Sequence, residues 1–428
     1  MTKKQDRPAR TRRNDHFGPA RSSPLLSSHH HPRQNSEIDA PGTPQMKSRI
    51  SSSPDDDDHA AYLWWRSAAG YEECQMLAGR PDAAASVASG LSPRVRVLRE
   101  MERLALVAPE GLDEVRQKLF AYRAGDFWVP TGGLSKEEMD IPATNTVLLA
   151  GFAGSGKSSL VNLMYSVLGR AGLIPFAQTS CGKSSSYTTM YLEEHNVVRS
   201  MRSGFCVYDS RGFDYSQVDE ALEELSDWMS QGVHHNQLCS RPGDRAFSED
   251  ESEFCPSRSS SKFVKRRVNC VVVVVNIAEV YKAMKAGDFE PLRATKELFS
   301  APALRKCNES PLLTLTHGDL LTTEERIEAR LKICESLGIP EASGVYDIVC
   351  LTEYGFLAEE ADPVTAYSLA EVVYRALLIS DRGHVPKNNF RDWACAAFSC
   401  LMWIFGALFG FLAVVCNKLG QRRKGFRI

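Results

Sequence analysis

The sequence predicts an α/β fold built on a doubly wound, mostly parallel sheet. From Thr144 to Asp381, apolar runs of strand length alternate with segments of helical periodicity. The run "CVVVVVNI" at 270–277 lacks polar alternation, as expected of a central parallel strand covered on both faces. A glycine-rich turn at 151–156 joins the first predicted strand to the first helix. A chain of 428 residues has room for such a domain and extensions.

Two segments precede this domain. Residues 1–60 are rich in Ser, Pro, His and charged residues, which predicts a disordered arm because little apolar surface can be buried. Residues 61–143 predict a helical extension with two helices, at 92–106 and 110–123. The first begins with a serine that can cap it and a proline that suits the first helical position.

The main domain is predicted to span 144–385. Its strands are expected at 144–150, 187–194, 204–209, 270–277, 311–317 and 347–352, and its helices at 157–169, 218–232, 322–338 and 363–380. A polar segment of low complexity at 233–266 interrupts the pattern and predicts a mobile surface insertion. This insertion could be a partner site or only a tolerated loop.

An uncharged stretch lies near the C-terminus. Residues 393–416 contain no charged side chain, and as a helix they would reach roughly 36 Å, enough to cross a hydrocarbon core of about 30 Å. A buried core helix is the alternative. We expect a transmembrane helix at 393–416 followed by a basic tail at 417–428, and hence a tail-anchored protein with a cytosolic domain. The basic tail favours a mitochondrial, plastid or peroxisomal outer membrane over other organelles.

Charge and cysteine content limit the other functions. The formal net charge is −2, which gives no argument for nucleic-acid binding, and we expect no nucleic-acid partner. The twelve cysteines form no CxxC pair or zinc spacing, a usage typical of a reduced compartment.

The strongest motif is "GFAGSGKSS" at 151–159, which fits G-x-x-x-x-G-K-[ST]. Backbone N–H groups in such a loop can surround phosphate oxygens, and the following helix N-terminus adds partial positive charge. Lys157 is expected to reach the β- and γ-phosphates, and the Ser158 hydroxyl to bind magnesium. The alternative is a glycine turn without a ligand. The predicted phosphate-binding residues are Gly151, Phe152, Ala153, Gly154, Ser155, Gly156, Lys157, Ser158 and Ser159.

Two further segments fit a nucleotide switch. "DSRG" at 209–212 ends a predicted strand, with Asp209 placed to face magnesium and Gly212 placed to contact a γ-phosphate. A threonine before the second strand should join both the metal and the γ-phosphate. Thr188 and Thr189 are the candidates, and the pattern "SYT" favours Thr188.

The segment "THGD" at the end of a later strand resembles the guanine-reading element [NT]-K-x-D of GTPases. Thr316, His317 and Asp319 are the predicted base-binding residues. Asp319 would accept hydrogen bonds from guanine N1 and N2, while His317 stands where a lysine is usual, which leaves adenine open. Thr352 and Glu353 follow the last predicted strand and are candidates for the fifth GTPase element.

Together, residues 144–380 resemble the TRAFAC class of P-loop GTPases. Within it they are most similar to the septin-like, membrane-associated branch that holds the GIMAP-type GTPases and the Toc-type receptors. "GKSSLVN" and "LTHG" are similar to Toc-type motifs, whereas "DSRG" departs from the usual D-T-P-G. The resemblance implies GTP and Mg²⁺ as ligands and dimerisation across the nucleotide faces.

Phe213 occupies the position where many GTPases keep a water-orienting glutamine. Members of this branch often carry an apolar residue there, so an isolated protomer should hydrolyse GTP slowly. Lys157 and Arg211 are the predicted catalytic residues, Arg211 acting like an arginine finger. An exposed loop arginine is the alternative for Arg211.

Three functions follow from these features. The first is a tail-anchored GTPase switch at a membrane surface, with protein partners that the sequence does not identify. The second is a nucleotide-binding or pseudo-GTPase scaffold with little or no hydrolysis. An ATP-dependent kinase or pump is weaker, because no transporter signature is present and a single span cannot form a transport path.

Overall fold

The computed structural model describes most of the chain beyond the N-terminal arm. The described residues are 61–78, 90–130, 133–169, 176–178, 189–198, 200, 203–239, 264–305, 310–350, 362–387 and 390–424. The predicted arm at 1–60 and most of the predicted insertion lie outside them, as do Thr188, Thr352 and Glu353.

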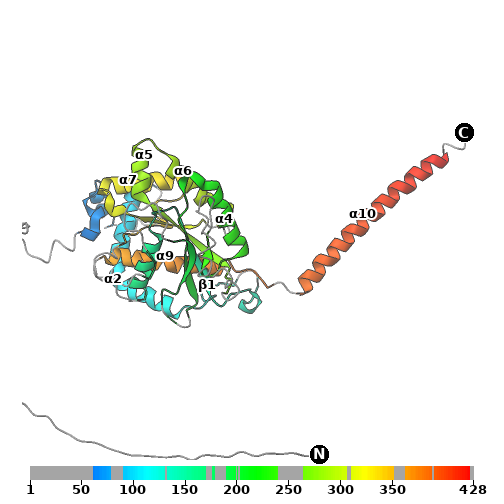
Figure 1. Cartoon of the computed structure of the whole chain (residues 1–428), viewed down its shortest axis with the longest axis horizontal. Coiled ribbons are helices and arrows are strands. Elements are labelled where there is room, and N and C mark those ends of the chain that lie inside the picture. Colours follow the sequence, from blue (N-terminus) through cyan, green and yellow to red (C-terminus); the bar gives the residue numbers. More distant parts are fainter. Residues whose placement is uncertain are drawn as a thin grey trace, which may run out of the picture. The chain divides into compact units, whose positions relative to one another are not determined.

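A seven-stranded sheet forms the centre of the described domain (Figure 1). Its spatial order is β4 (Gln237–Leu238), β2 (Tyr191–His195), β3 (Phe205–Asp209), β1 (Asn145–Ala150), β5 (Val268–Asn276), β6 (Leu312–Thr316) and β7 (Val345–Asp347). All neighbours are parallel except β2–β3 and β2–β4, which are antiparallel. The predicted α/β class is therefore confirmed. The last strand lies earlier than 347–352, because Ile348 already leaves the ladder while still bonding to Leu315.

Helices cover both faces of this sheet. They are α2 (Pro93–Ala121), α3 (Lys157–Val167), α4 (Val218–Gln231), α5 (Ile277–Lys285), α6 (Glu290–Ser300), α7 (Thr323–Leu337) and α9 (Pro363–Arg382). Two shorter N-terminal helices, η1 (Ala61–Ser67) and α1 (Tyr71–Ala78), pack against α2, and α10 (Phe390–Lys424) follows α9 in the chain. Short 3-10 turns lie at η4 (Lys136–Glu138), η5 (Tyr215–Gln217), η9 (Pro302–Leu304) and η10 (Gly318–Leu320).

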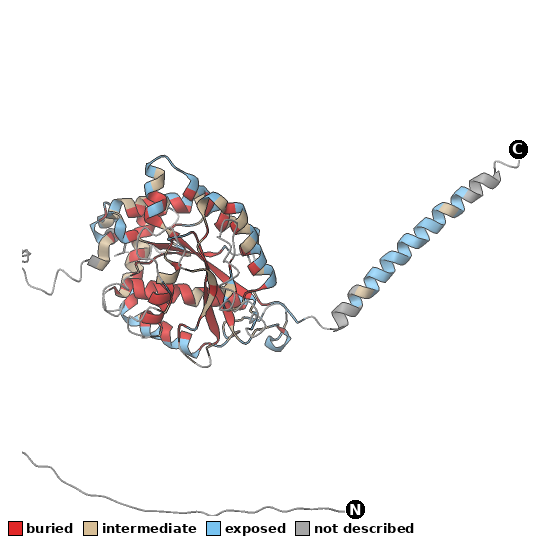
Figure 2. Ribbon diagram, in the orientation of Figure 1, coloured by how far each residue is buried: buried red, intermediate tan, exposed pale blue. Residues whose placement is uncertain are grey.

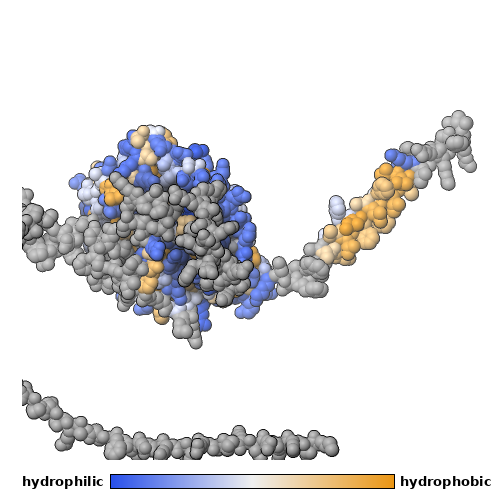
Figure 3. Space-filling view, viewed as in Figure 1, coloured by the Kyte–Doolittle hydropathy of each residue, from blue (hydrophilic) through white to orange (hydrophobic). Residues whose placement is uncertain are grey.

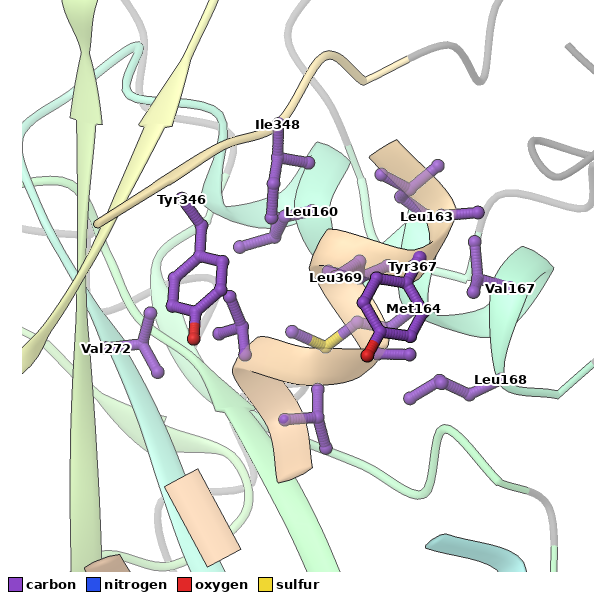
Figure 4. Close-up of a cluster of buried hydrophobic side chains, with 14 of the residues drawn as sticks. Leu160, Leu163, Met164, Val167, Leu168, Val272, Tyr346, Ile348, Tyr367 and Leu369 are labelled. Atoms are coloured by element: carbon purple, nitrogen blue, oxygen red, sulfur yellow. The ribbon is translucent and has the colours of Figure 1, made fainter. Parts of the chain in front are cut away.

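The core has two layers because side chains alternate across the strands. Val147 and Leu149 of β1 face a cluster made with α2, α3 and α9, while Leu148 and Ala150 face a cluster made with α4, α5, α6 and α7. Figure 4 shows part of the first layer, in which α3 and α9 side chains belong to the same buried cluster as Val272 of β5 and Tyr346 of β7. This sandwich fixes the position of the turn between β1 and α3.

The N-terminal extension contains one long helix where two were predicted. α2 runs from Pro93 to Ala121 through Pro109, so the prediction of separate helices at 92–106 and 110–123 is wrong. The buried stripe continues across the proline, with Leu104, Ala108 and Leu112 all against the core. Packing along this stripe offsets the backbone hydrogen bond that Pro109 cannot donate. The predicted start is confirmed, since Ser92 accepts from the Val95 N–H at 3.4 Å.

The C-terminal helix α10 differs from the other helices in composition and burial. Residues Ala397–Lys418 have a mean hydropathy of 2.3, and none of that window is buried against the described chain (Figures 2 and 3). Large apolar side chains such as Trp403 and Phe409 are exposed. Among the described residues, α10 is the one helix that is both long enough and apolar enough to span a membrane.

Candidate functional site

Three sequence motifs meet at one edge of the sheet. The turn at 151–156 follows β1, "DSRG" begins at the last residue of β3, and "THGD" begins at the last residue of β6. These three strands are parallel, so their carboxyl ends lie together. Ligands of open α/β sheets bind at this edge.

Glycines shape the turn between β1 and α3. Gly154 and Gly156 have φ of 72° and 85°, the left-handed region that side chains rarely adopt. A Cβ at Gly151 would lie 2.2 Å from the carbonyl oxygen of Val274. The chain therefore curls tightly before α3, whose first N–H groups have no intrahelical partner.

Lys157 begins α3 and folds back over the turn. It is 5% exposed, and its Nζ donates to the carbonyls of Gly151 and Phe152, both at 3.0 Å, and to Ser155 Oγ at 3.3 Å. These contacts hold the ammonium group inside the curl. Lys157 thus adds a positive charge to a loop that already presents helix N-terminal amides.

A cluster of oxygen ligands lies beside Lys157. Ser158 Oγ donates to Asp209 Oδ2 at 2.6 Å and lies 3.3 Å from the Thr189 hydroxyl. Two of the three predicted metal-binding residues, Ser158 and Asp209, are thus in direct contact although they lie 51 positions apart. Thr189 is the threonine that the structure brings to this point, whereas the favoured Thr188 lies outside the described residues.

Asp209 is suited to a metal ion. It is 1% exposed, and its Oδ1 has no hydrogen-bond partner among the described residues. Burial raises the pKa of Asp209, although the Ser158 hydroxyl and the Lys157 charge oppose that shift. A divalent cation would stabilise the ionised form. The set of one carboxylate and two hydroxyls consists of hard oxygen donors, which fits Mg²⁺.

Gly212 and Phe213 join the second motif to the first. The Phe213 N–H donates to the Gly151 carbonyl at 3.0 Å, and the Ala153 N–H donates to the Phe213 carbonyl at 2.8 Å. A Cβ at Gly212 would lie 2.5 Å from Ala153 Cα, so only glycine fits this approach. The Phe213 ring is 0% exposed and packs 5.9 Å from the ring of Trp228. The Phe213 side chain therefore belongs to the core, while the Phe213 backbone holds the turn at 151–156 in place.

Arg211 is not an exposed loop residue, so that alternative is wrong. It is 2% exposed, and its Nη1 donates to the Cys239 carbonyl at 2.7 Å, next to β4. The arrangement gives Arg211 a structural partner at the edge of the sheet. Its assignment as a catalytic finger stays a prediction.

The third motif braces the first from the other side. Thr316 Oγ1 donates to the Ser155 carbonyl at 2.7 Å. His317 has a φ of 58°, and its ring approaches Gly156, where a Cβ would lie 3.2 Å from His317 Cε1. Burial lowers the pKa of His317, with Asp319 opposing the shift. A neutral imidazole next to the P-loop turn is therefore favoured.

Asp319 and its surroundings form the outer end of the site. Asp319 is exposed, so its carboxylate is accessible to a ligand. Burial raises the pKa of the Cys350 thiol to about 12, and the charge of Asp319 adds to this shift. Two residues outside the predicted set also lie near these motifs: Cys350, which is affected by the charge of Asp319, and Asn276, whose Nδ2 donates to the Gly154 carbonyl at 3.3 Å. Asn276 is the last residue of β5, and this position could have indicated from the sequence that it lies near the site.

Comparisons with known proteins assign no family. No family model matches this chain, and no curated protein matches it. The solved structures that are similar to it include two from Chaetomium thermophilum. The signal recognition particle receptor SRb–GTP/SRX complex matches with 14% identity over 50% of this chain and 97% of that chain, at a TM-score of 0.24. The signal recognition particle receptor SRb–GDP matches with 13% identity over 51% and 95%, at 0.22. The G-domain-like α/β fold is inferred from the strand order and from the loops that follow β1, β3 and β6.

Proposed function

We propose that this protein binds GTP with Mg²⁺, hydrolyses it slowly and acts as a switch at a membrane surface. The observation that supports this most strongly is the 2.6 Å contact between Ser158 and Asp209. It places a P-loop hydroxyl and a D-x-x-G carboxylate together beside a buried lysine. A glycine turn that binds no ligand would not require this hydroxyl, carboxylate and lysine to lie together.

Each part of the site has a role in this proposal. The amides of the P-loop turn and Lys157 would bind the phosphates, and Asp319 would read the base. Ser158, Thr189 and Asp209 would hold Mg²⁺, which neutralises phosphate charge when bound. Thr188 and the pair after β7, Thr352 and Glu353, stay predictions.

Slow hydrolysis follows from the position of Phe213. Its ring lies in the core, so no side chain at this position orients a water. Even a small GTPase that has a glutamine there turns over at only about 10⁻⁴–10⁻³ per second unaided. A faster reaction would need a group from a partner, and dimerisation across the nucleotide faces is the prediction that we retain.

The burial of Phe213 also favours a second candidate, a nucleotide-binding scaffold without hydrolysis. Phosphate release from GTP by the full chain in lipid nanodiscs separates the two candidates. The switch predicts slow release that Lys157→Ala abolishes. Release no faster than in the Lys157→Ala sample would favour the scaffold.

The membrane part of the proposal rests on α10. Its apolar stretch at 397–418 is long enough to cross a bilayer, and exposing so many apolar side chains to water is costly. The tail-anchored topology and the choice of mitochondrial, plastid or peroxisomal outer membrane remain predictions from the sequence.

A further inference from the structure

A buried arginine, Arg326, lies directly behind the base-reading turn. A Cβ at Gly318 would lie 2.3 Å from Arg326 Nε and 2.7 Å from Cζ, so the guanidinium packs against the backbone next to Asp319. The same guanidinium forms a two-point ion pair with Asp347 at the end of β7, at 2.8 Å and 2.6 Å. Arg326 therefore contacts the ends of both strands that lead into the proposed base site.

The N-terminal extension reaches this arginine through Trp64. The Arg326 Cζ lies 4.0 Å from the centre of the Trp64 ring, a close cation–π contact. The Trp64 carbonyl also accepts a hydrogen bond from Thr323 Oγ1 at 3.3 Å, at the start of α7. The extension thus touches Arg326 and the first turn of the helix that carries it.

Trp64 is held firmly in this place. Its neighbour Trp65 is 0% exposed and donates from Nε1 to Glu102 of α2 at 3.1 Å. Arg66 forms an ion pair with the same carboxylate at 2.7 Å. On the other side, the Ala69 N–H donates to Glu324 of α7 at 2.9 Å. These contacts of the neighbouring residues therefore hold the Trp64 ring in place against Arg326.

We propose that Trp64 is a positioning residue for guanine recognition, since its ring fixes Arg326 and Arg326 fixes the turn that carries Asp319. This inference rests on the proposed function, because it names what orients the base-reading carboxylate. Trp64 itself touches no nucleotide. Its loss should weaken contacts to the base and leave contacts to the phosphates intact.

GTP and ITP provide the test, because ITP lacks the 2-amino group and keeps the same phosphates. Affinities of the full chain in nanodiscs would be measured by competition with a fluorescent guanine nucleotide. The unmodified protein should prefer GTP by about tenfold, since Asp319 gains one charge-assisted hydrogen bond. Trp64→Leu should reduce the preference for GTP over ITP to about threefold or less. The same preference in Trp64→Phe should stay within about twofold of that of the unmodified protein. Trp64→Met is a second flexible apolar variant with the same expectation as leucine.

Tyr71→Phe is the matched control, because it removes a hydrogen bond to Glu102 in the same extension and does not touch Arg326. Its GTP-to-ITP preference should be unchanged. A Trp64→Leu or Trp64→Met protein that loses GTP and ITP affinity equally, or neither, would overturn the positioning role. An unmodified protein that binds neither nucleotide would instead refute the proposed function, a distinct result.

Discussion

The N–H of Phe213 donates to the carbonyl of Gly151 at 3.0 Å, and this bond ties the D-x-x-G segment to the start of the P-loop. The Phe213 ring is fully buried and packs edge-on to the ring of Phe152, with the two ring centroids 6.4 Å apart. One residue therefore braces the proposed phosphate site with its backbone and fills the core with its side chain. A glutamine here could not take the water-orienting role that it has in many GTPases without leaving the core.

Phe213→Gln should not create a faster GTPase. The change puts an amide into a fully buried apolar site and should cost about 3 kcal/mol of unfolding free energy. Phosphate release should stay within about twofold of the unmodified rate. Phe213→Leu is the control and should cost about 1 kcal/mol. A tenfold faster Phe213→Gln protein of normal stability would show that the ring is not needed in the core.

Ser158→Ala should uncouple nucleotide binding from magnesium. The substitution removes the hydroxyl next to Asp209 and leaves the backbone N–H groups of the P-loop in place. In Mg²⁺ buffer the GTP affinity should fall about tenfold or more, and removing the metal with EDTA should then have little further effect. Ser230→Ala, which removes an exposed hydroxyl from α4, is the control and should keep the magnesium response. An unchanged response in Ser158→Ala would place the metal elsewhere.

Asp381 joins α9, β1 and the segment that directly follows α2. Its 0% exposed carboxylate accepts hydrogen bonds from Tyr122 Oη, Gly125 N, Phe127 N and Asn145 Nδ2 at 2.7–2.8 Å. Burial opposes ionisation, but hydrogen bonds, including one from His384, outweigh it and lower the pKa of Asp381. The carboxylate therefore stabilises the folded state in its charged form.

Asp381→Asn should destabilise the fold by about 2–4 kcal/mol, because an amide oxygen cannot satisfy all of these donors. The stabilisation by Asp381 is fully present above the unfolded carboxyl pKa of about 4 and is lost as pH falls through the lower folded pKa. Thermal unfolding between about pH 2 and 5 should therefore depend less on pH in Asp381→Asn. Asp126→Asn, an exposed carboxylate in the same region, is the control. If the unmodified protein, Asp381→Asn and Asp126→Asn showed the same dependence of thermal unfolding on pH, the stabilising role of the Asp381 hydrogen-bond network would be contradicted.

Features that depend on residues close together in the sequence could be predicted, whereas features that depend on contacts between distant segments could not. The P-loop was predictable because its glycines and Lys157 are adjacent in sequence and act through the backbone. The meeting of Asp209 with Ser158 could be expected from parallel strands ending at one edge. The burial of Arg211 and the contact of Trp64 with Arg326 could not, because they depend on segments far apart in the chain. The continuity of α2 through Pro109 likewise depends on tertiary packing.

The role of α10 can be tested by flotation. The full chain should float with liposomes and resist alkaline extraction, because 397–418 is apolar and long enough to span a bilayer. Replacing Phe405 and Leu408 by arginine should greatly reduce insertion, since each charge near the helix centre costs about 2.5–3.5 kcal/mol. Replacing the same two residues by valine is the control. Equal flotation of the arginine and valine proteins would remove α10 as the anchor.

The most direct test of the account is calorimetric titration of GTP with Mg²⁺ into the full chain in nanodiscs. We expect saturable binding in the micromolar range or tighter, competition by GDP but not by excess ATP, and loss of binding in Lys157→Ala. A folded protein that takes up neither GTP nor ATP would contradict the account, and binding that survives Lys157→Ala would remove the P-loop as its site.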